Sequence, residues 1–238
     1  MVDLTVYSSI GVRSAAEELF RKFEKQSACR LAVTWGTAPM LVGRIEAGER
    51  ADVLILSHAG IDALRKQSKV LAGTDVTLAG SGVAIAVKAG KPKPDISTPE
   101  ALKQTLLKAK SVAYSEPSAG GASGVYFAKL LERMGIAEQM KPKTKYPPAG
   151  GFSAELLLTG AAELAVQQKP ELLHVSGVDI VGFLPGDLNL VTEFTVAIMT
   201  GSKNAETGKA LIGSLRSPEA AAVLRSKGLD PRQTVAAA

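Results

Sequence analysis

The sequence predicts an α/β protein of two lobes, each a mainly parallel sheet flanked by helices. Two observations lead to this class. Segments with the two-residue period of strands alternate with segments of helical period along most of the chain. In addition, two long apolar runs of β-type composition, residues 80–87 and 193–199, separate two βα-rich halves and predict two strands that join the lobes. Helices follow the second run, so we expect the chain to return to its first lobe.

The first half of the chain is predicted to contain three strand–helix pairs. The strands are expected at 4–8, 31–35 and 52–56, and the helices at 14–27, 40–47 and 60–67. Because crossovers between parallel strands are right-handed, the three strand-to-helix corners are expected at one edge of the sheet.

The second half repeats the alternation. Thr98 and Pro99 are typical of a helix start, with a hydroxyl cap followed by proline in the first turn. Further helices are predicted at 101–109, 125–134, 153–159, 171–174, 204–215 and 218–226, and strands at 112–115, 164–167 and 178–183. The predicted division is a discontinuous lobe, 1–84 with 194–238, and a continuous lobe, 85–193, with a ligand cleft between them.

Composition excludes several kinds of site. Cys29 is the only cysteine, so an intrachain disulfide and a zinc site of several thiolates are both excluded. His58 and His174 are far apart and lack the spacing of metal ligands. We therefore expect neither a metal nor a cofactor.

Charge and hydropathy limit the partners. The net charge is +5, but the basic residues are dispersed and aromatic residues make up only 5%, so nucleic-acid binding is not expected. No apolar run reaches the ~18–20 residues of a membrane span, so membrane insertion is not expected either. We expect a monomer whose mild positive field suits a small anionic ligand. The expected location is the periplasm if a leader was removed from this sequence, and otherwise the cytoplasm.

Four segments that precede predicted helices share a chemistry suited to an anion. Each alone has the ordinary composition of a cap or turn. Together they bring small and hydroxyl residues to helix starts, where unpaired backbone N–H groups carry partial positive charge. The segments are SSIGVR (8–13), GTAP (36–39), SAGGASG (118–124) and PAGGFS (148–153).

Several stretches resemble the periplasmic molybdate-binding protein family. They are LTVYSSIGVRSAAEELFRKFEK, GTAPMLVGRIEAGERADVLILS and GGASGVYFAKLLERMG, of which IEAGERADVLI is the most specific. The family belongs to the type II periplasmic substrate-binding proteins, and aconitate isomerase resembles it too. The resemblance implies a two-lobed type II periplasmic binding protein fold, with a small anion bound by hinge closure. For an exported member it also implies an ABC permease as partner.

The resemblance also implies ligand-binding positions, and several depart from the family's pattern. Gly11 stands where the family has a serine, and Gln168 stands where a tyrosine usually closes the pocket. These departures favour an organic carboxylate over molybdate. The full set of expected ligand-binding residues is Ser8, Ser9, Gly11, Arg13, Thr37, Ala38, Ser123, Phe152 and Gln168.

Two questions stay open at the level of sequence. Arg13 either points inward, where its guanidinium would suit a carboxylate, or lies outward as a solvated surface residue. The protein is either a solute-binding protein, the favoured interpretation, or an isomerase that shifts a double bond in a tricarboxylate. An isomerase needs a base, for which His58 is the candidate and Lys169 a weaker one. An effector-sensing domain of a transcription regulator is a third, less favoured class.

Overall fold

The chain folds into two compact units. The computed structural model describes residues 2–148 and 150–232. Unit 1 comprises Met1–Gly80 and Thr192–Ala238, and unit 2 comprises Ser81–Val191. The chain passes from one unit to the other within β4 (Val76–Lys88) and again at the start of β9 (Val191–Ile198).

Unit 1 is built on a sheet with the strand order β2-β1-β3-β9-β4. Strand β1 pairs in parallel with β2 and β3, whereas β9 pairs antiparallel with β3. The remaining strands are β1 (Val2–Ser9), β2 (Cys29–Gly36), β3 (Val53–Ser57) and β10 (Asp230–Pro231). The helices are α1 (Arg13–Gln26), α2 (Ala38–Glu46), α3 (His58–Lys66), α9 (Ala205–Leu215) and α10 (Pro218–Ser226).

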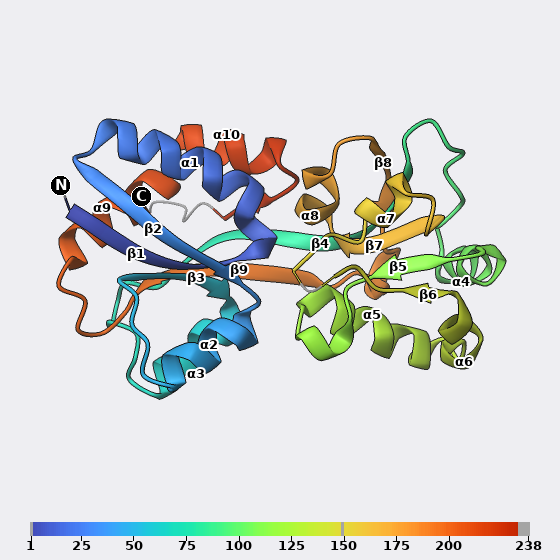
Figure 1. Cartoon of the computed structure of the whole chain (residues 1–238), viewed down its shortest axis with the longest axis horizontal. Coiled ribbons are helices and arrows are strands. Elements are labelled where there is room, and N and C mark those ends of the chain that lie inside the picture. The colour runs from blue at the N-terminus through green and yellow to red at the C-terminus, as the bar shows by residue number, and fades with distance from the viewer. Residues whose placement is uncertain (1, 149, 233–238) are drawn as a thin grey trace. The chain divides into compact units, whose positions relative to one another are not determined.

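Helices cover both faces of the unit 1 sheet, which explains why the first four residues of β3 are all apolar. Val53 and Ile55 belong to the core shared with α1, α9 and α10, and Leu54 and Leu56 belong to the core shared with α2 and α3. Figure 1 shows α1 and α10 on one side of this sheet and α2 and α3 on the other. A strand buried on both faces has a continuous apolar sequence instead of an alternating one.

Unit 2 has the strand order β4-β7-β5-β6, with β8 also paired to β4. Strand β5 pairs in parallel with β6 and β7, and β4 pairs antiparallel with β7 and β8. The strands are β5 (Val112–Tyr114), β6 (Thr144–Lys145), β7 (Leu164–Gln168) and β8 (Val178–Phe183). The helices are α4 (Pro99–Lys108), α5 (Ala122–Arg133), α6 (Ala137–Met140), α7 (Glu155–Leu158) and α8 (Lys169–His174).

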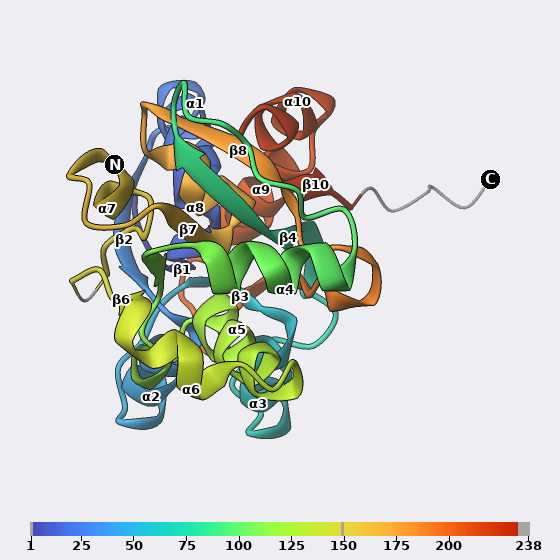
Figure 2. The same ribbon diagram turned by 90° about the vertical axis from the view of Figure 1, so that its right-hand side faces the viewer.

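The size of the side chains on β4 matches what covers each face. Val83 and Ile85 belong to the core shared with α4, α5 and α6 (Figure 2). Ala84 and Ala86 belong to the opposite core, where the short helices α7 and α8 pack. Small residues on that face let the helices approach the strand closely.

The α/β class and the principal elements agree with the sequence prediction. The prediction missed α6 and β6, which are too short to establish a period, and the short 3₁₀ helix Ile10–Val12 before α1. It gave a mainly parallel sheet in each lobe and did not include the antiparallel pairings of β4 and β9 with their neighbours. Among the helices in the described part of the chain, none is long and apolar enough to cross a bilayer.

Candidate functional site

Three strand-to-helix corners of unit 1 lie at one edge of its sheet, as the parallel order predicts. Ser9 at the end of β1 pairs with Gly36 at the end of β2, and Ser8 pairs with Ile55 of β3. The 3₁₀ turn that leads into α1 therefore starts beside the beginnings of α2 and α3. Ligands of open α/β sheets bind beyond this carboxyl edge.

The first corner is tightly packed. Ser8 is fully buried, and the Ser9 Oγ accepts a hydrogen bond from the Gly11 N–H at 3.4 Å, capping the 3₁₀ turn. A Cβ atom at Gly11 would lie 2.5 Å from Cζ of Phe194, the fourth residue of β9. The buried Phe194 ring thus occupies the space that a side chain at position 11 would need. Sequence reasoning missed Phe194, because it follows Gly11 by more than 180 residues and carries no motif.

The Arg13 side chain contacts two residues of unit 1, Glu17 and Trp35. Its Nε donates to Glu17 Oε1 at 2.7 Å, and its guanidinium carbon lies 5.5 Å from the centre of the Trp35 ring. The side chain is 38% exposed. The Arg13 Nε can therefore bind a carboxylate of a ligand only after giving up Glu17.

The second corner contains Thr37 and Ala38. Thr37 is the N-cap residue of α2, and Pro39 lies in the first turn of that helix. A Cβ atom at Gly60 of α3 would lie 3.3 Å from the Ala38 Cβ, so α2 and α3 begin in close contact. The structure thus brings the second and third corners together.

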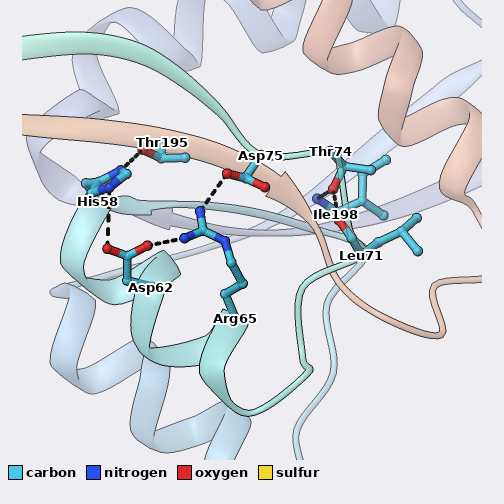
Figure 3. A network of polar contacts seen from close by, with 8 residues as sticks. All are labelled: His58, Asp62, Arg65, Leu71, Thr74, Asp75, Thr195 and Ile198. Carbon is cyan, nitrogen blue, oxygen red and sulfur yellow. Dashed lines mark hydrogen bonds and ion pairs between the residues drawn. The ribbon is translucent and has the colours of Figure 1, made fainter.

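His58, the predicted base, begins α3 and contacts two side chains (Figure 3). Nδ1 lies 3.2 Å from Thr195 Oγ1 on β9, and Nε2 lies 3.4 Å from Asp62 Oδ2. Proximity to a carboxylate favours the tautomer with the proton on Nε2, so that Nδ1 accepts from the Thr195 hydroxyl. Asp62 also pairs with Arg65, which binds Asp75 at 2.6 Å. In this arrangement the Nδ1 lone pair is engaged by the Thr195 hydroxyl, so His58 must give up that hydrogen bond before Nδ1 can accept a proton from a substrate.

Unit 2 also presents corners at the carboxyl edge of parallel strands, those after β5, β6 and β7. Ser123 is buried in the first turn of α5, which follows β5. A Cβ atom at Gly124 would lie 2.1 Å from the Ser115 carbonyl oxygen, so the helix begins directly against the backbone that leaves the strand. This close approach fixes the position of Ser123.

The segment after β6 is fastened to β7 by one side chain. Gln167 Oε1 accepts from the Ser153 N–H at 2.8 Å and from the Ser153 Oγ at 2.9 Å. Phe152 is buried, with its ring centre 4.6 Å from that of the exposed His174. Ala149, within the predicted segment 148–153, lies outside the described residues. The structure therefore brings Phe152 close to the end of β7, where Gln168 lies.

Gln168 ends β7 and forms a capping box with Glu171 at the start of α8. The Gln168 N–H donates to Glu171 Oε2 at 3.2 Å. Burial raises the pKa of Glu171 to about 7, although hydrogen bonds from the Gln168 backbone and the Gln167 side chain lower it. Lys169, the weaker base candidate, lies with Nζ 5.1 Å from the centre of the Phe183 ring. Sequence reasoning did not single out Glu171, although a Gln followed three residues later by Glu has the spacing of a capping box.

The sequence match decides the family. Residues 4–230 match the family described as bacterial extracellular solute-binding protein. The chain belongs to this family. The resemblance noted from the sequence is thereby confirmed.

Relatives of this solute-binding protein differ in what their names say they do. It is 36% identical to an aconitate isomerase of Pseudomonas sp. over 96% of its own length and 87% of the relative's. It is 24% identical to the molybdate-binding protein ModA of Escherichia coli K12, over 94% of its length and 88% of the relative's.

Solved structures establish the type II periplasmic binding protein fold. The periplasmic molybdate-binding protein of Azotobacter vinelandii superposes with a TM-score of 0.78 at 18% identity, covering 97% of this chain and 100% of that one. The substrate-binding domain of a molybdenum ABC transporter from Clostridium difficile gives a TM-score of 0.76 at 16% identity, covering 98% and 100%. The predicted ligand cleft and the predicted ligand-binding residues stay predictions.

The helices of this solute-binding protein differ in whether their first turns contain an acidic residue. Helices α1, α2, α3 and α5, which begin at the corners, carry no acidic residue there. Helices α4, α9 and α10 begin elsewhere and carry Glu100, Glu206 and Glu219. Acidic residues are favoured at helix N-termini because they offset the positive end of the dipole. Helices α1, α2, α3 and α5 thus leave that end without an internal acid, whereas α7 and α8, which also follow corners, carry Glu155 and Glu171. In the described ranges 2–148 and 150–232, no group of three acidic, histidine or cysteine side chains is placed to hold a metal ion.

Proposed function

We propose that this solute-binding protein binds a small organic polycarboxylate at its strand-to-helix corners. The observation that carries the proposal is that four helices that begin at corners, α1, α2, α3 and α5, carry no acidic residue in their first turns. An anion placed there meets backbone N–H groups and hydroxyl groups without an internal carboxylate competing for them.

Two further observations support a carboxylate over molybdate. The identity to the aconitate isomerase, 36%, exceeds the identity to the E. coli molybdate-binding protein, 24%, over similar lengths. Position 11 cannot take a serine without displacing Phe194. The first corner therefore combines an aromatic ring with backbone N–H donors. Such a ring suits a ligand with carbon atoms better than a bare oxyanion.

Calorimetry with five probes tests this proposal: citrate, cis-aconitate, trans-aconitate, molybdate and sulfate. We expect at least one tricarboxylate to bind with micromolar affinity, and neither oxyanion to bind within tenfold of it. The same tricarboxylate should raise the melting temperature, because a ligand that binds only the folded state stabilises it. Tight molybdate binding without tricarboxylate binding would overturn the proposal.

The second candidate is isomerisation of aconitate, and the 36% identical relative is what favours it. In this reaction a base removes a proton from the methylene carbon, the double bond shifts, and a proton returns to the former vinylic carbon. The atoms balance without a co-reactant. His58 is the proposed base, and its Thr195 and Asp62 contacts would set the ring orientation.

Proton NMR in deuterated water tests the isomerase. We expect cis-aconitate to convert to trans-aconitate with deuterium entering the product. His58→Gln should lower the rate at least 100-fold, because a general base contributes about 10²–10⁴-fold. Lys66→Gln on the same helix is the control and should leave the rate unchanged. If the wild-type protein binds aconitate without converting it, the binding function alone stands.

Transport is the expected setting if binding is the whole function. The family is described as extracellular, which supports an exported chain that delivers its ligand to an ABC permease. Fractionation of cells that express the natural gene should then place the protein outside the cytoplasm. An isomerase would not require the permease.

A further inference from the structure

Glu171 is a buried acid that neither the family nor the proposed function accounts for. It is 7% exposed and lies in the first turn of α8, three residues after the end of β7. Its carboxyl group receives two hydrogen bonds, from the Gln168 N–H at 3.2 Å and from the Gln167 side chain.

These contacts connect Glu171 to two predicted ligand-binding segments. The first is Gln168 itself, whose backbone the carboxyl group holds. The second is the segment ending at Ser153, because Gln167 Oε1 accepts from both the N–H and the Oγ of that residue. Gln167 and the Gln168 backbone thus connect the Glu171 carboxyl group to both segments.

The charged groups near Glu171 are all engaged elsewhere. Strands β7 and β8 pack against α8, and β7 contains no titratable side chain. On β8, Asp179 accepts from the Gly90 N–H at 2.9 Å. Lys169 and His174 of α8 contact Phe183 and Phe152, and Glu155 of the neighbouring α7 is exposed. Among the residues that the structure describes, no cation forms an ion pair with Glu171, and its shifted pKa has no charge among its causes.

We propose that Glu171 is a positioning residue for the candidate site in unit 2. When an anion binds beside Gln168, the Glu171 carboxyl group takes up a proton. This inference rests on the proposed function. A negative ligand near a buried acid favours the neutral form of that acid, since the two charges would repel in a medium of low dielectric. Linkage is reciprocal, so protonation of Glu171 must favour binding of the anion to the same extent. The proton comes from solvent, and no covalent bond of the ligand changes.

Titration calorimetry with citrate at pH 7.5, in phosphate and in Tris, tests the inference. The two buffers differ in ionisation enthalpy, so the difference in heat gives the number of protons taken up. Citrate's own protonation contributes equally to all variants, so the difference between wild type and Glu171→Gln belongs to Glu171. We expect wild type to take up at least 0.3 protons more than Glu171→Gln. Glu155→Gln, at an exposed position of α7, is the matched control and should behave as wild type.

The pH profile gives a second readout that a merely structural role would not change. Between pH 7 and 8 the wild-type Kd for citrate should rise up to tenfold relative to Glu171→Gln, because a coupled proton contributes about one decade per pH unit. Equal proton uptake and parallel pH profiles would overturn the inference while leaving the proposed function intact. If neither wild type nor variants bind citrate or either aconitate, both fail.

If the Glu171→Gln variant does not fold, the inference can still be tested on the wild-type protein alone. Carbon-13 NMR of the glutamate carboxyl groups then follows the Glu171 titration directly, with and without citrate. We expect its midpoint to rise by at least one pH unit when citrate is added. An unchanged midpoint under saturating citrate would overturn the inference.

Discussion

The Phe194 ring fills the space beside Gly11, where a Cβ atom would approach Cζ to 2.5 Å and Cε1 to 3.0 Å. The two residues are separated by most of the chain, yet together they form the wall of the first corner. Phe194 pairs across the sheet with Ser57, so it also lies beside the third corner. One aromatic side chain therefore determines the shape of two of the predicted binding corners.

Gly11→Ala should lower the free energy of unfolding by about 1–3 kcal/mol, because overpacking forces the ring to move. Urea denaturation measures the change. Phe194→Leu in the same chain should recover part of the loss, giving a favourable coupling energy in the double-mutant cycle. Gly43→Ala is the control: its Cβ would meet no atom within 4 Å, and on an exposed helix it should stabilise by about 0.5–1 kcal/mol. Equal effects at both glycines would refute the close packing.

Gly124→Ala should damage the Ser123 corner more severely. The added Cβ would lie 2.1 Å from a backbone oxygen, that of Ser115, which cannot rotate away as a side chain can. We expect a loss of at least about 2 kcal/mol in unfolding free energy, together with weaker citrate binding. Gly213→Ala, with no atom within 4 Å of its Cβ, serves as the helical control. A variant with wild-type stability would show that α5 starts farther from β5 than described.

Glu171 should make the free protein less stable as the pH rises. Its folded-state pKa of about 7 lies above the ordinary value of 4.5, so the folded state holds the proton more tightly. The stabilisation is fully present below pH 4.5 and is lost as the pH rises to about 7, by up to about 3 kcal/mol. Glu171→Gln should remove this component from a series of urea unfolding curves between pH 4.5 and 8. Identical pH profiles would show that the acid titrates normally.

Arg13→Ala should weaken tricarboxylate binding only a few-fold, because its guanidinium is already engaged by Glu17 and Trp35. The lost ion pair is partly exposed, so stability should fall by no more than about 1 kcal/mol. Glu17→Gln is the informative partner, since it releases Arg13 without removing it. If Arg13→Ala abolishes binding and Glu17→Gln strengthens it, Arg13 contacts the ligand directly.

The sequence predicted the fold where local periodicity and tertiary structure agree. The long apolar run at 80–87 falls within β4, and the helix 218–226 coincides with α10. The antiparallel pairing of β4 could not be predicted, because Val83 and its neighbours have the same period whether they pair in parallel or antiparallel. The two-residue strand Thr144–Lys145 is defined by its partner β5, and no local pattern marks it.

The sequence predicted less of the candidate site. It identified the corners, because Ser, Thr and Gly before a helix are a local signal. It did not identify Phe194 or the bonds between Gln167 and Ser153, since these contacts depend on which segments the fold brings together. For Arg13 the sequence left two orientations open, because the choice depends on a neighbouring strand residue, Trp35.

The interrupted first unit has a consequence for how the protein is made. Strand β3 needs β9 as its neighbour, and α1 packs against α10, yet β9 and α10 are translated only after all of Ser81–Val191. During synthesis Val53–Ser57 therefore lacks its β9 partner until the C-terminal segment has been made. The continuous unit is complete earlier and can fold first. A ribosome stalled once Val191 has left the exit tunnel should hold a folded second unit tethered to an unfinished first one, exposed to chaperones at its open strand.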